Sequence, residues 1–200
     1  LKYNYQIIIE YLGANFVGWQ IQKNGTSIQE VLQKKLKKVF RSNIKLIGSG
    51  RTDKGVNAWR QSANFYLDKK IDNKKKAISS INFFLNKFQI SVIDLKKKDL
   101  NFHARFSARK RIYEYYIINE GDKLSIYDNR AWLVRKGLDI KKMKRALNFL
   151  IGTHDFSSFR ASSCGADSPV RTITKANIIK KDSKIIINFV SKSFLQQQVR

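Results

Sequence analysis

The hydrophobic pattern changes its period several times along the first half of the chain, and the order of these changes restricts the folds that the chain can adopt. Apolar and polar residues alternate over four segments, which we expect to be strands: 3–12, 44–47, 63–67 and 88–95. Helical spacing of apolar residues predicts one helix that begins after Ser27 and another over residues 73–86. The resulting order of strand, helix, strand, strand, helix, strand predicts a split βαβ, or ferredoxin-like, arrangement.

The start of the first helix has a specific local signal. Ser27 and Glu30 have the spacing of a capping box, in which each side chain bonds a backbone N–H group of the first turn. An apolar stripe at helical spacing follows: Ile28, Val31, Leu32, Leu36, Val39 and Phe40.

The second half of the chain partly repeats the scheme. We expect strands over residues 111–119, 130–135, 172–179 and 185–190, and a helix over 139–151 with Asp139 as its N-cap and Gly152 as its stop. The prediction is therefore an α+β protein of two ferredoxin-like halves, residues 1–103 and 104–200, whose antiparallel sheets join around a central cleft. The closing helix of the second half is expected beyond Arg200, so this half is predicted to be incomplete.

Charge is the strongest compositional feature. Lys and Arg number 40 against 15 Asp and Glu, which gives a formal net charge of +25. Such an excess favours polyanionic partners, nucleic acid first. The lysine runs lie among many Ile and Asn residues, a mixture that an AT-biased genome also produces without selection for binding.

Cysteine and histidine are scarce. Cys164 has no second cysteine with which to form an internal disulfide, and together with His103 and His154 it does not supply an ordinary four-ligand zinc site. This usage fits a reducing, cytoplasmic setting. No segment approaches the roughly eighteen apolar residues of a membrane-spanning helix, so we expect no membrane association.

A glycine-rich segment, residues 48–55, is the candidate for chemistry. It lacks the third glycine of a dinucleotide fingerprint and the lysine of a P-loop. What remains is the carboxylate of Asp53 between Arg51 and Lys54, whose positive charges favour its ionised form. An ionised carboxylate can act as a nucleophile or stabilise charge. By residue type alone, an Asx-turn or a cap is the commoner role for such an aspartate.

The segment Gly50–Val56 closely resembles the catalytic loop of the tRNA pseudouridine synthase A family. Seven further segments resemble blocks of that family in the same order: 16–20, 27–30, 102–108, 111–115, 152–159, 171–173 and 194–200. The resemblance covers essentially the whole chain. It implies an isomerase that converts uridine to pseudouridine in the anticodon arm of tRNA, at the positions conventionally numbered 38 to 40, and it implies no metal or organic cofactor.

The resemblance also implies roles for individual residues. Asp53 matches the catalytic aspartate and Arg200 the arginine that pairs with it. Tyr113 matches the tyrosine that contacts the target uridine, and we assign Arg51 and Arg105 to RNA binding or loop positioning. Similar proteins are homodimers that bind tRNA in a basic cleft between their sheets, so the same is expected here. Asp53, Tyr113 and Arg200 should then converge in that cleft.

Other interpretations of these residues stay open. Tyr113 shares a strand face with Tyr115 and Ile117, which also suits core packing, and the pair His154–Asp155 is expected to be structural. Where the family commonly has His, Pro and Met, this chain has Asn57, Asn86 and Gln198. The main alternative function is a non-catalytic basic module that stacks and neutralises an RNA strand. A structural protein associated with ribosomes is a third possibility.

Overall fold

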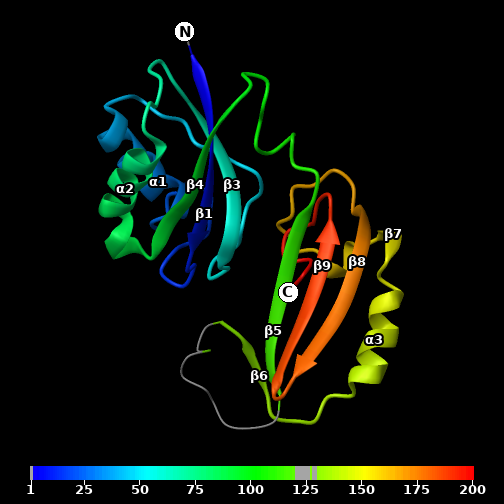
Figure 1. The fold of residues 1–200 in the computed structure, drawn as a ribbon. Coiled ribbons are helices and arrows are strands. Elements are labelled where there is room, and N and C mark those ends of the chain that lie inside the picture. Colours follow the sequence, from blue (N-terminus) through cyan, green and yellow to red (C-terminus); the bar gives the residue numbers. More distant parts are fainter. Residues whose placement is uncertain (1, 120–126, 128–129) are drawn as a thin grey trace. The chain divides into compact units, whose positions relative to one another are not determined.

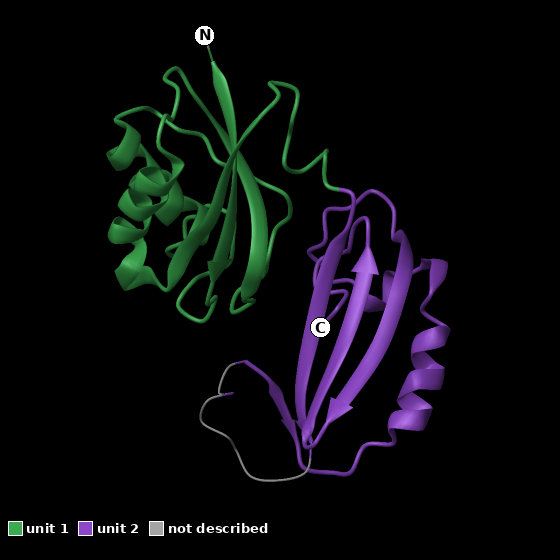
Figure 2. Ribbon diagram, in the orientation of Figure 1, with its two compact units in different colours: residues 1–108 green, residues 109–200 purple. Residues whose placement is uncertain are grey.

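The computed structural model describes residues 2–119, 127 and 130–200, and the chain divides into two compact units, residues 1–108 and 109–200 (Figure 2). Each unit contains one β-sheet and at least one helix, so the protein is a mixed α+β protein (Figure 1). Within the described ranges, no helix is long and apolar enough to cross a membrane.

Unit 1 contains the predicted order of strands and helices. Its elements are β1 (Tyr3–Tyr11), α1 (Ile28–Phe40), β2 (Ile47–Gly48), β3 (Ala58–Leu67), α2 (Lys74–Leu85), the short 3₁₀ helix η1 (Asn86–Phe88) and β4 (Ile90–Lys98). The strands form one antiparallel sheet in the order β2-β3-β1-β4. The two strands at the centre of the sheet, β3 and β1, are thus distant in sequence.

The helices of unit 1 begin at side-chain caps and pack on the sheet. The Ser27 hydroxyl accepts a hydrogen bond from the Glu30 N–H at 3.2 Å, as predicted, and Asn73 caps α2 in the same way. The predicted stripe of α1 is buried at Ile28, Val31, Leu32 and Leu36. These residues join the alternate apolar residues of β1 in one core: Tyr5, Ile7, Ile9 and Tyr11.

The predicted strand over 44–47 is wrong for most of its length, because β2 includes only Ile47 and Gly48. Two glutamines of α1 form hydrogen bonds with the backbone of Leu46, the residue before β2. Gln29 donates to the Leu46 carbonyl at 2.8 Å, and Gln33 accepts from the Leu46 N–H at 2.8 Å. Backbone groups that are satisfied by side chains have no need of a strand partner. The segment is therefore bonded to the helix before it reaches the sheet.

Unit 2 consists of β5 (Arg111–Asn119), β6 (Trp132–Val134), α3 (Ile140–Asn148), β7 (Gly152–Asp155), the 3₁₀ helix η3 (Ser157–Phe159), β8 (Val170–Lys181) and β9 (Lys184–Ser191). The sheet has the order β6-β5-β9-β8-β7. The expectation of purely antiparallel sheets is wrong here, since β6 pairs with β5 in parallel. The connection of residues 120–131 is long enough for the crossover that parallel pairing requires. Strand β7 was not predicted.

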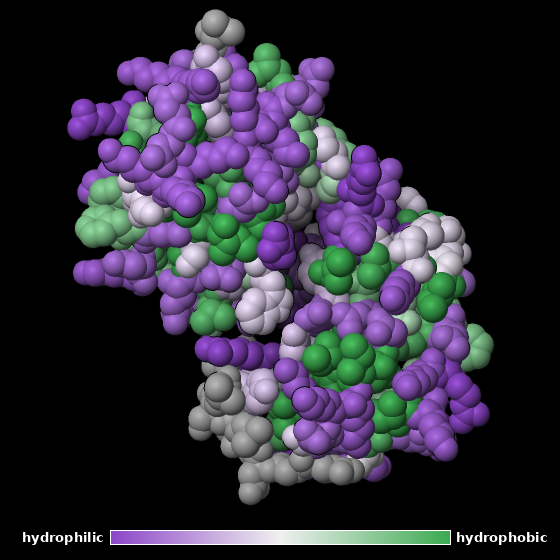
Figure 3. Space-filling view, viewed as in Figure 1, coloured by the Kyte–Doolittle hydropathy of each residue, from purple (hydrophilic) through white to green (hydrophobic). Residues whose placement is uncertain are grey.

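The core of unit 2 lies between its sheet and α3, which runs beside β8 (Figure 1). Asp139 caps α3 as predicted, and its carboxylate accepts from the Lys142 N–H at 2.9 Å. Several large apolar side chains of this unit are exposed: Ile112, Trp132, Phe149, Ile151, Phe159, Val170 and Ile179. Apolar patches are visible on the surface of this unit in Figure 3.

Candidate active site

The candidate catalytic loop, residues 49–57, connects β2 with β3 and is bonded to the segment that follows β1. The Trp19 N–H donates to the Thr52 carbonyl at 3.0 Å, and the Gly13 N–H donates to Asn57 Oδ1 at 2.8 Å. The hydroxyl groups of Tyr11 and Thr52 lie 2.8 Å apart and share a hydrogen bond. Three bonds thus hold the loop from outside its own hairpin.

The base of the loop is bonded to β3. The Ser49 N–H donates to the Ser62 carbonyl at 2.8 Å, and Gln61 Nε2 donates to the Gly50 carbonyl at 2.6 Å. Within the loop, the Val56 N–H donates to the Asp53 carbonyl at 3.2 Å and closes a turn. Hydrogen bonds therefore fix the backbone on both sides of Asp53.

Two glycines allow the supporting segment to approach this closely. A Cβ atom at Gly13 would lie 2.2 Å from the Val56 carbonyl oxygen. Gly18 has a φ of +117° and a Cβ there would lie 2.7 Å from the Thr52 carbonyl oxygen. Positive φ and close backbone approach both favour glycine.

The Asp53 carboxylate differs from the backbone that carries it. Its side chain is half-buried, yet within residues 2–108 it has no hydrogen-bond or ion-pair partner. A half-buried carboxylate on a well-bonded loop is available for a ligand, because no bond from the described residues of unit 1 competes for its oxygens. The Asx-turn considered from the sequence is not formed by its side chain.

The two predicted RNA-contacting arginines of unit 1 are exposed. Arg51 lies in the same loop as Asp53, and Arg105 lies in the segment after β4. The guanidinium of Arg105 lies 5.6 Å from the ring centroid of Phe106, whose ring stacks on His103 at 4.4 Å. This segment therefore presents a cation and two stacked rings.

Tyr113 lies near the start of β5 in unit 2, half-buried on the sheet face that carries the apolar core. Its ring meets the Phe194 ring edge to face at 5.0 Å. Tyr113 pairs with Phe189 of β9 and shares its face with Tyr115, as predicted. Its setting at the edge of the core combines packing with a ring that is still partly exposed.

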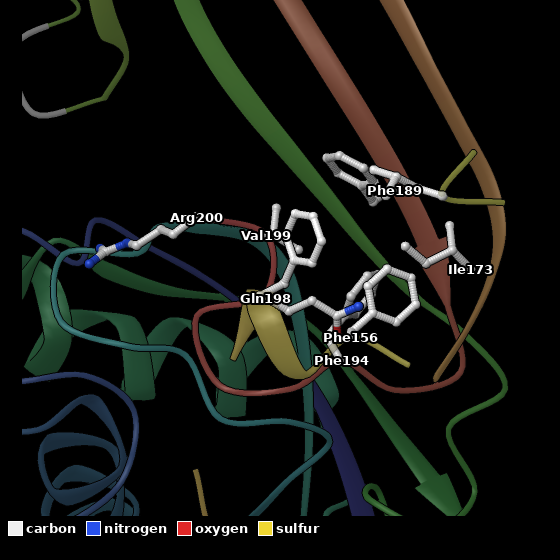
Figure 4. A pocket seen from close by; sticks show the side chains of 9 residues that line it. Phe156, Ile173, Phe189, Phe194, Gln198, Val199 and Arg200 are labelled. Carbon is white, nitrogen blue, oxygen red and sulfur yellow. The ribbon is translucent and has the colours of Figure 1, made fainter. Parts of the chain in front are cut away.

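Arg200 is exposed and its backbone N–H donates to the Gln197 carbonyl at 2.9 Å. It lines a cavity of about 160 Å³ whose wall is mainly apolar, and its side chain points away from the rings (Figure 4). Phe194 lines the same cavity and contacts Tyr113, so unit 2 brings Tyr113 and Arg200 into one neighbourhood. The convergence of Asp53 with these two residues remains a prediction.

The three departures from the family pattern have different surroundings. Asn57 bonds Gly13, as described above, and Asn86 begins η1 directly after α2. Gln198 is buried; its Oε1 accepts from the Leu195 N–H at 2.8 Å, whereas its Nε2 has no partner among the described residues. Asn57 is thus part of the loop support, and Gln198 is a local weakness of unit 2.

His154 and Asp155 bond different backbone groups. His154 Nε2 donates to the Ile151 carbonyl at 2.9 Å, since a carbonyl can only accept. The pKa of Asp155 lies below its ordinary value, chiefly because the Ser157 side chain bonds its carboxylate. The Ser157 N–H, which lies 2.7 Å from Asp155 Oδ1, is the second cause. These bonds agree with the structural role expected for the pair.

Neither Cys164 nor a metal-binding group adds a further candidate site among the described residues. Hydrogen bonds to the backbone of Gln196, and secondly of Ala166, lower the pKa of the half-buried Cys164 thiol. In the part of the chain that the structure describes, no three His, Cys, Asp or Glu residues form a group that could hold a metal ion.

Comparison with known proteins agrees with the sequence motifs. A family model described as tRNA pseudouridine synthase matches residues 7–107 and 146–200, which include the loop of Asp53. The tRNA pseudouridine synthase A of Pelagibacter ubique (strain HTCC1062) is 54% identical over 99% of this chain and 80% of its own length. That of Ehrlichia canis (strain Jake) is 48% identical over 98% of this chain and 80% of its own length. The chain therefore belongs to the tRNA pseudouridine synthase family of isomerases.

Proposed function

We propose that this protein isomerises uridine to pseudouridine at positions 38 to 40 of the anticodon arm of tRNA, with Asp53 as nucleophile. The observation that carries the proposal is the contrast within residues 49–57: the backbone is bonded on both sides, and the half-buried Asp53 carboxylate has no partner within unit 1. A stability role would use the carboxylate oxygens. A catalytic role requires them to be open to the substrate.

The chemistry of the proposal needs one ionised oxygen and no external reagent. The Asp53 carboxylate attacks the flipped nucleotide, at C1′ of the ribose or at C6 of the base. The C1′–N1 bond breaks, the uracil turns, and a C1′–C5 bond forms. The bond from the Asp53 oxygen to C1′ or C6 also breaks, which restores the carboxylate. A proton leaves C5 and N1 gains one, so uridine and pseudouridine have the same composition.

The other site residues supply binding and orientation in this proposal. Tyr113 contacts the target base, and stacking on an aromatic ring returns part of the few kcal/mol that flipping a base costs. Arg200 pairs with the Asp53 carboxylate, which fixes its orientation and leaves an oxygen lone pair for the attack. Arg51 and Arg105 contact the RNA backbone, as their exposure permits.

The finer architecture belongs to the same proposal. The βαββαβ order of unit 1 and its strand order β4-β1-β3-β2 support a ferredoxin-like half. We assign the catalytic loop to a first domain, residues 1–103, and the residues from 104 onward to a second, with a basic RNA-binding cleft between their sheets. We further propose a cytoplasmic homodimer.

The test is modification of uridine-containing tRNA, with pseudouridine mapped chemically at each position. Asp53→Asn keeps the shape of the side chain and removes its charge, so we expect tRNA affinity to be retained and the rate to fall by about a thousandfold or more. The control is Asp68→Asn, which removes an exposed carboxylate at the end of β3 and should leave the rate unchanged. Equal modification by wild type and Asp53→Asn would exclude Asp53 as the nucleophile, and product at positions outside 38 to 40 would overturn the assigned target.

A further inference from the structure

Two buried asparagines of unit 1 have no role in the chemistry described above. Asn4 of β1 and Asn64 of β3 are fully buried, and they lie diagonally across the pair of strands, since Asn4 pairs with Tyr66 and Gln6 with Asn64. Burial of an amide costs free energy unless its polar atoms are bonded. The hydrogen-bond partners of the two amides therefore indicate the role of Asn4 and Asn64.

The partners lie in the segment after β4. Asn4 Nδ2 donates to the carbonyls of Asp99 at 2.9 Å and Phe102 at 2.7 Å. Asn64 Nδ2 donates to Asn4 Oδ1 at 3.0 Å, and Asn64 Oδ1 accepts from the Ala104 N–H at 2.9 Å. The carbonyls of Asp99 and Phe102 can only accept and the Ala104 N–H can only donate, so the orientation of both amides is fixed.

These bonds hold residues 99–104 to the sheet face opposite the helices. This face carries further polar contacts, with Gln6 bonded to Ser62 at 2.8 Å and the Tyr66 hydroxyl donating to the Leu100 carbonyl at 3.2 Å. An apolar residue at position 4 or 64 could not bond a crossing loop. The asparagine pair thus replaces hydrophobic packing as the means of attachment.

The attached segment leads directly into the exposed group that carries Arg105. Ala104 is buried beside the asparagine pair, and the next two residues are the exposed Arg105 and Phe106. The Ser107 N–H donates to the His103 carbonyl at 2.8 Å, and the His103 N–H donates to the Ser107 hydroxyl at 3.1 Å. These two bonds close the turn, and the bond at Ala104 joins it to the sheet.

We propose that Asn4 and Asn64 are positioning residues that fix Arg105 and the stacked pair His103–Phe106 in the place where they contact tRNA. The inference rests on the proposed function, because it takes Arg105 as an RNA contact. A preorganised loop pays less ordering entropy on binding. The pair therefore acts on tRNA binding rather than on the step at Asp53.

The test replaces both amides with apolar side chains of similar volume, Asn4→Leu with Asn64→Leu, which removes all four bonds. We expect the KM for tRNA to rise about tenfold and kcat to change less than twofold. Gln6→Leu is the matched control, because it removes an amide from the same sheet face that bonds Ser62 and not the 99–104 segment. A rise in KM no larger for the double variant than for the control overturns the proposal.

Two measurements separate positioning from general destabilisation. Hydrogen exchange without tRNA should show faster exchange at Ala104, whose N–H loses its bond to Asn64, while the amides of β1 and β3 stay protected. In a double-mutant cycle, the asparagine substitutions should add almost nothing to the KM of a variant that lacks all three contacts, His103→Ala with Arg105→Ala and Phe106→Ala. Full additivity, or unchanged exchange at Ala104, contradicts the inference. The exchange result does not depend on catalysis, so it stands apart from the outcome for Asp53→Asn.

If the double variant does not fold, the single variant Asn64→Ser tests the same proposal with a smaller change. The shorter serine side chain moves the acceptor away from the Ala104 N–H, and the Asn4 bonds to Asp99 and Phe102 stay in place. An intermediate rise in KM with faster exchange at Ala104 supports the proposal, and a wild-type KM with faster exchange contradicts it.

Discussion

The two units bury their apolar residues to different extents. Among the described residues, twenty belong to the buried core cluster of unit 1 and eight to that of unit 2. Unit 1 covers one sheet face with two helices, whereas the described part of unit 2 has α3 alone. The unit that presents the candidate catalytic loop therefore has the larger buried core, which suits the proposed role of Asp53 as a fixed carboxylate.

Both units nevertheless use buried asparagine to hold a crossing segment. In unit 2, Asn119 Nδ2 donates to the carbonyls of Val134 at 2.9 Å and Lys136 at 2.8 Å, and its Oδ1 accepts from the Leu138 N–H at 3.2 Å. Asn4 and Asn64 bond three backbone groups of unit 1 in the same manner. A carboxamide serves this purpose because it carries donors and an acceptor on one short side chain.

The largest effect should come from the same core deletion made in each unit. Leu32 of α1 is fully buried and Leu147 of α3 is 8% exposed. We expect Leu32→Ala to lower the free energy of unfolding of unit 1 by about 4 kcal/mol and Leu147→Ala to lower that of unit 2 by about 2 kcal/mol. Hydrogen exchange of the sheet amides measures each unit by itself. Equal losses would mean that the two cores are equally tight.

A smaller effect is expected from the loop support of unit 1. Gly13→Ala places a methyl group 2.2 Å from the Val56 carbonyl oxygen, so the segment or the loop must shift. A displaced Asp53 should lower kcat about 50-fold, which corresponds to roughly 2 kcal/mol. Gly165→Ala of unit 2 is the control, since no atom lies within 4 Å of a Cβ there. A normal kcat for Gly13→Ala would show that the loop tolerates movement.

The smallest effect concerns Asp155 of unit 2. Its pKa is lowered by the Ser157 hydroxyl and N–H, so the ionised form stabilises the folded state above the unfolded pKa of about 3.9. This contribution is lost as the pH falls through the folded pKa. We expect Asp155→Asn to lower the melting temperature slightly at pH 7 and to equal wild type near pH 2.

The check is a pair of melting curves at each pH, repeated in a Ser157→Ala background. That background removes the largest cause of the shift, so the pH-dependent difference should shrink there. A difference that stays constant from pH 7 to pH 2 would assign the effect of Asp155→Asn to packing.

Local signals predicted the helices and most strands of both units. Ser27, Asn73 and Asp139 lie at or beside the predicted helix starts, and each caps a backbone N–H three residues ahead. Such bonds depend only on neighbouring residues, so the sequence alone contains them. The parallel pairing of β6 and the bonds that shorten β2 join separate elements, and no local pattern indicates them.

The candidate site divides in the same way. The sequence by itself determined the family and proposed Asp53 and its loop as the candidate site, because ordered motifs along the chain carry both. Only the tertiary structure decided that Tyr11 and Gly13 support this loop and that Asn4 and Asn64 hold residues 99–104. The physical reason is sequence separation: these bonds join residues roughly forty to one hundred positions apart, and their donors and acceptors meet only when the sheet has formed.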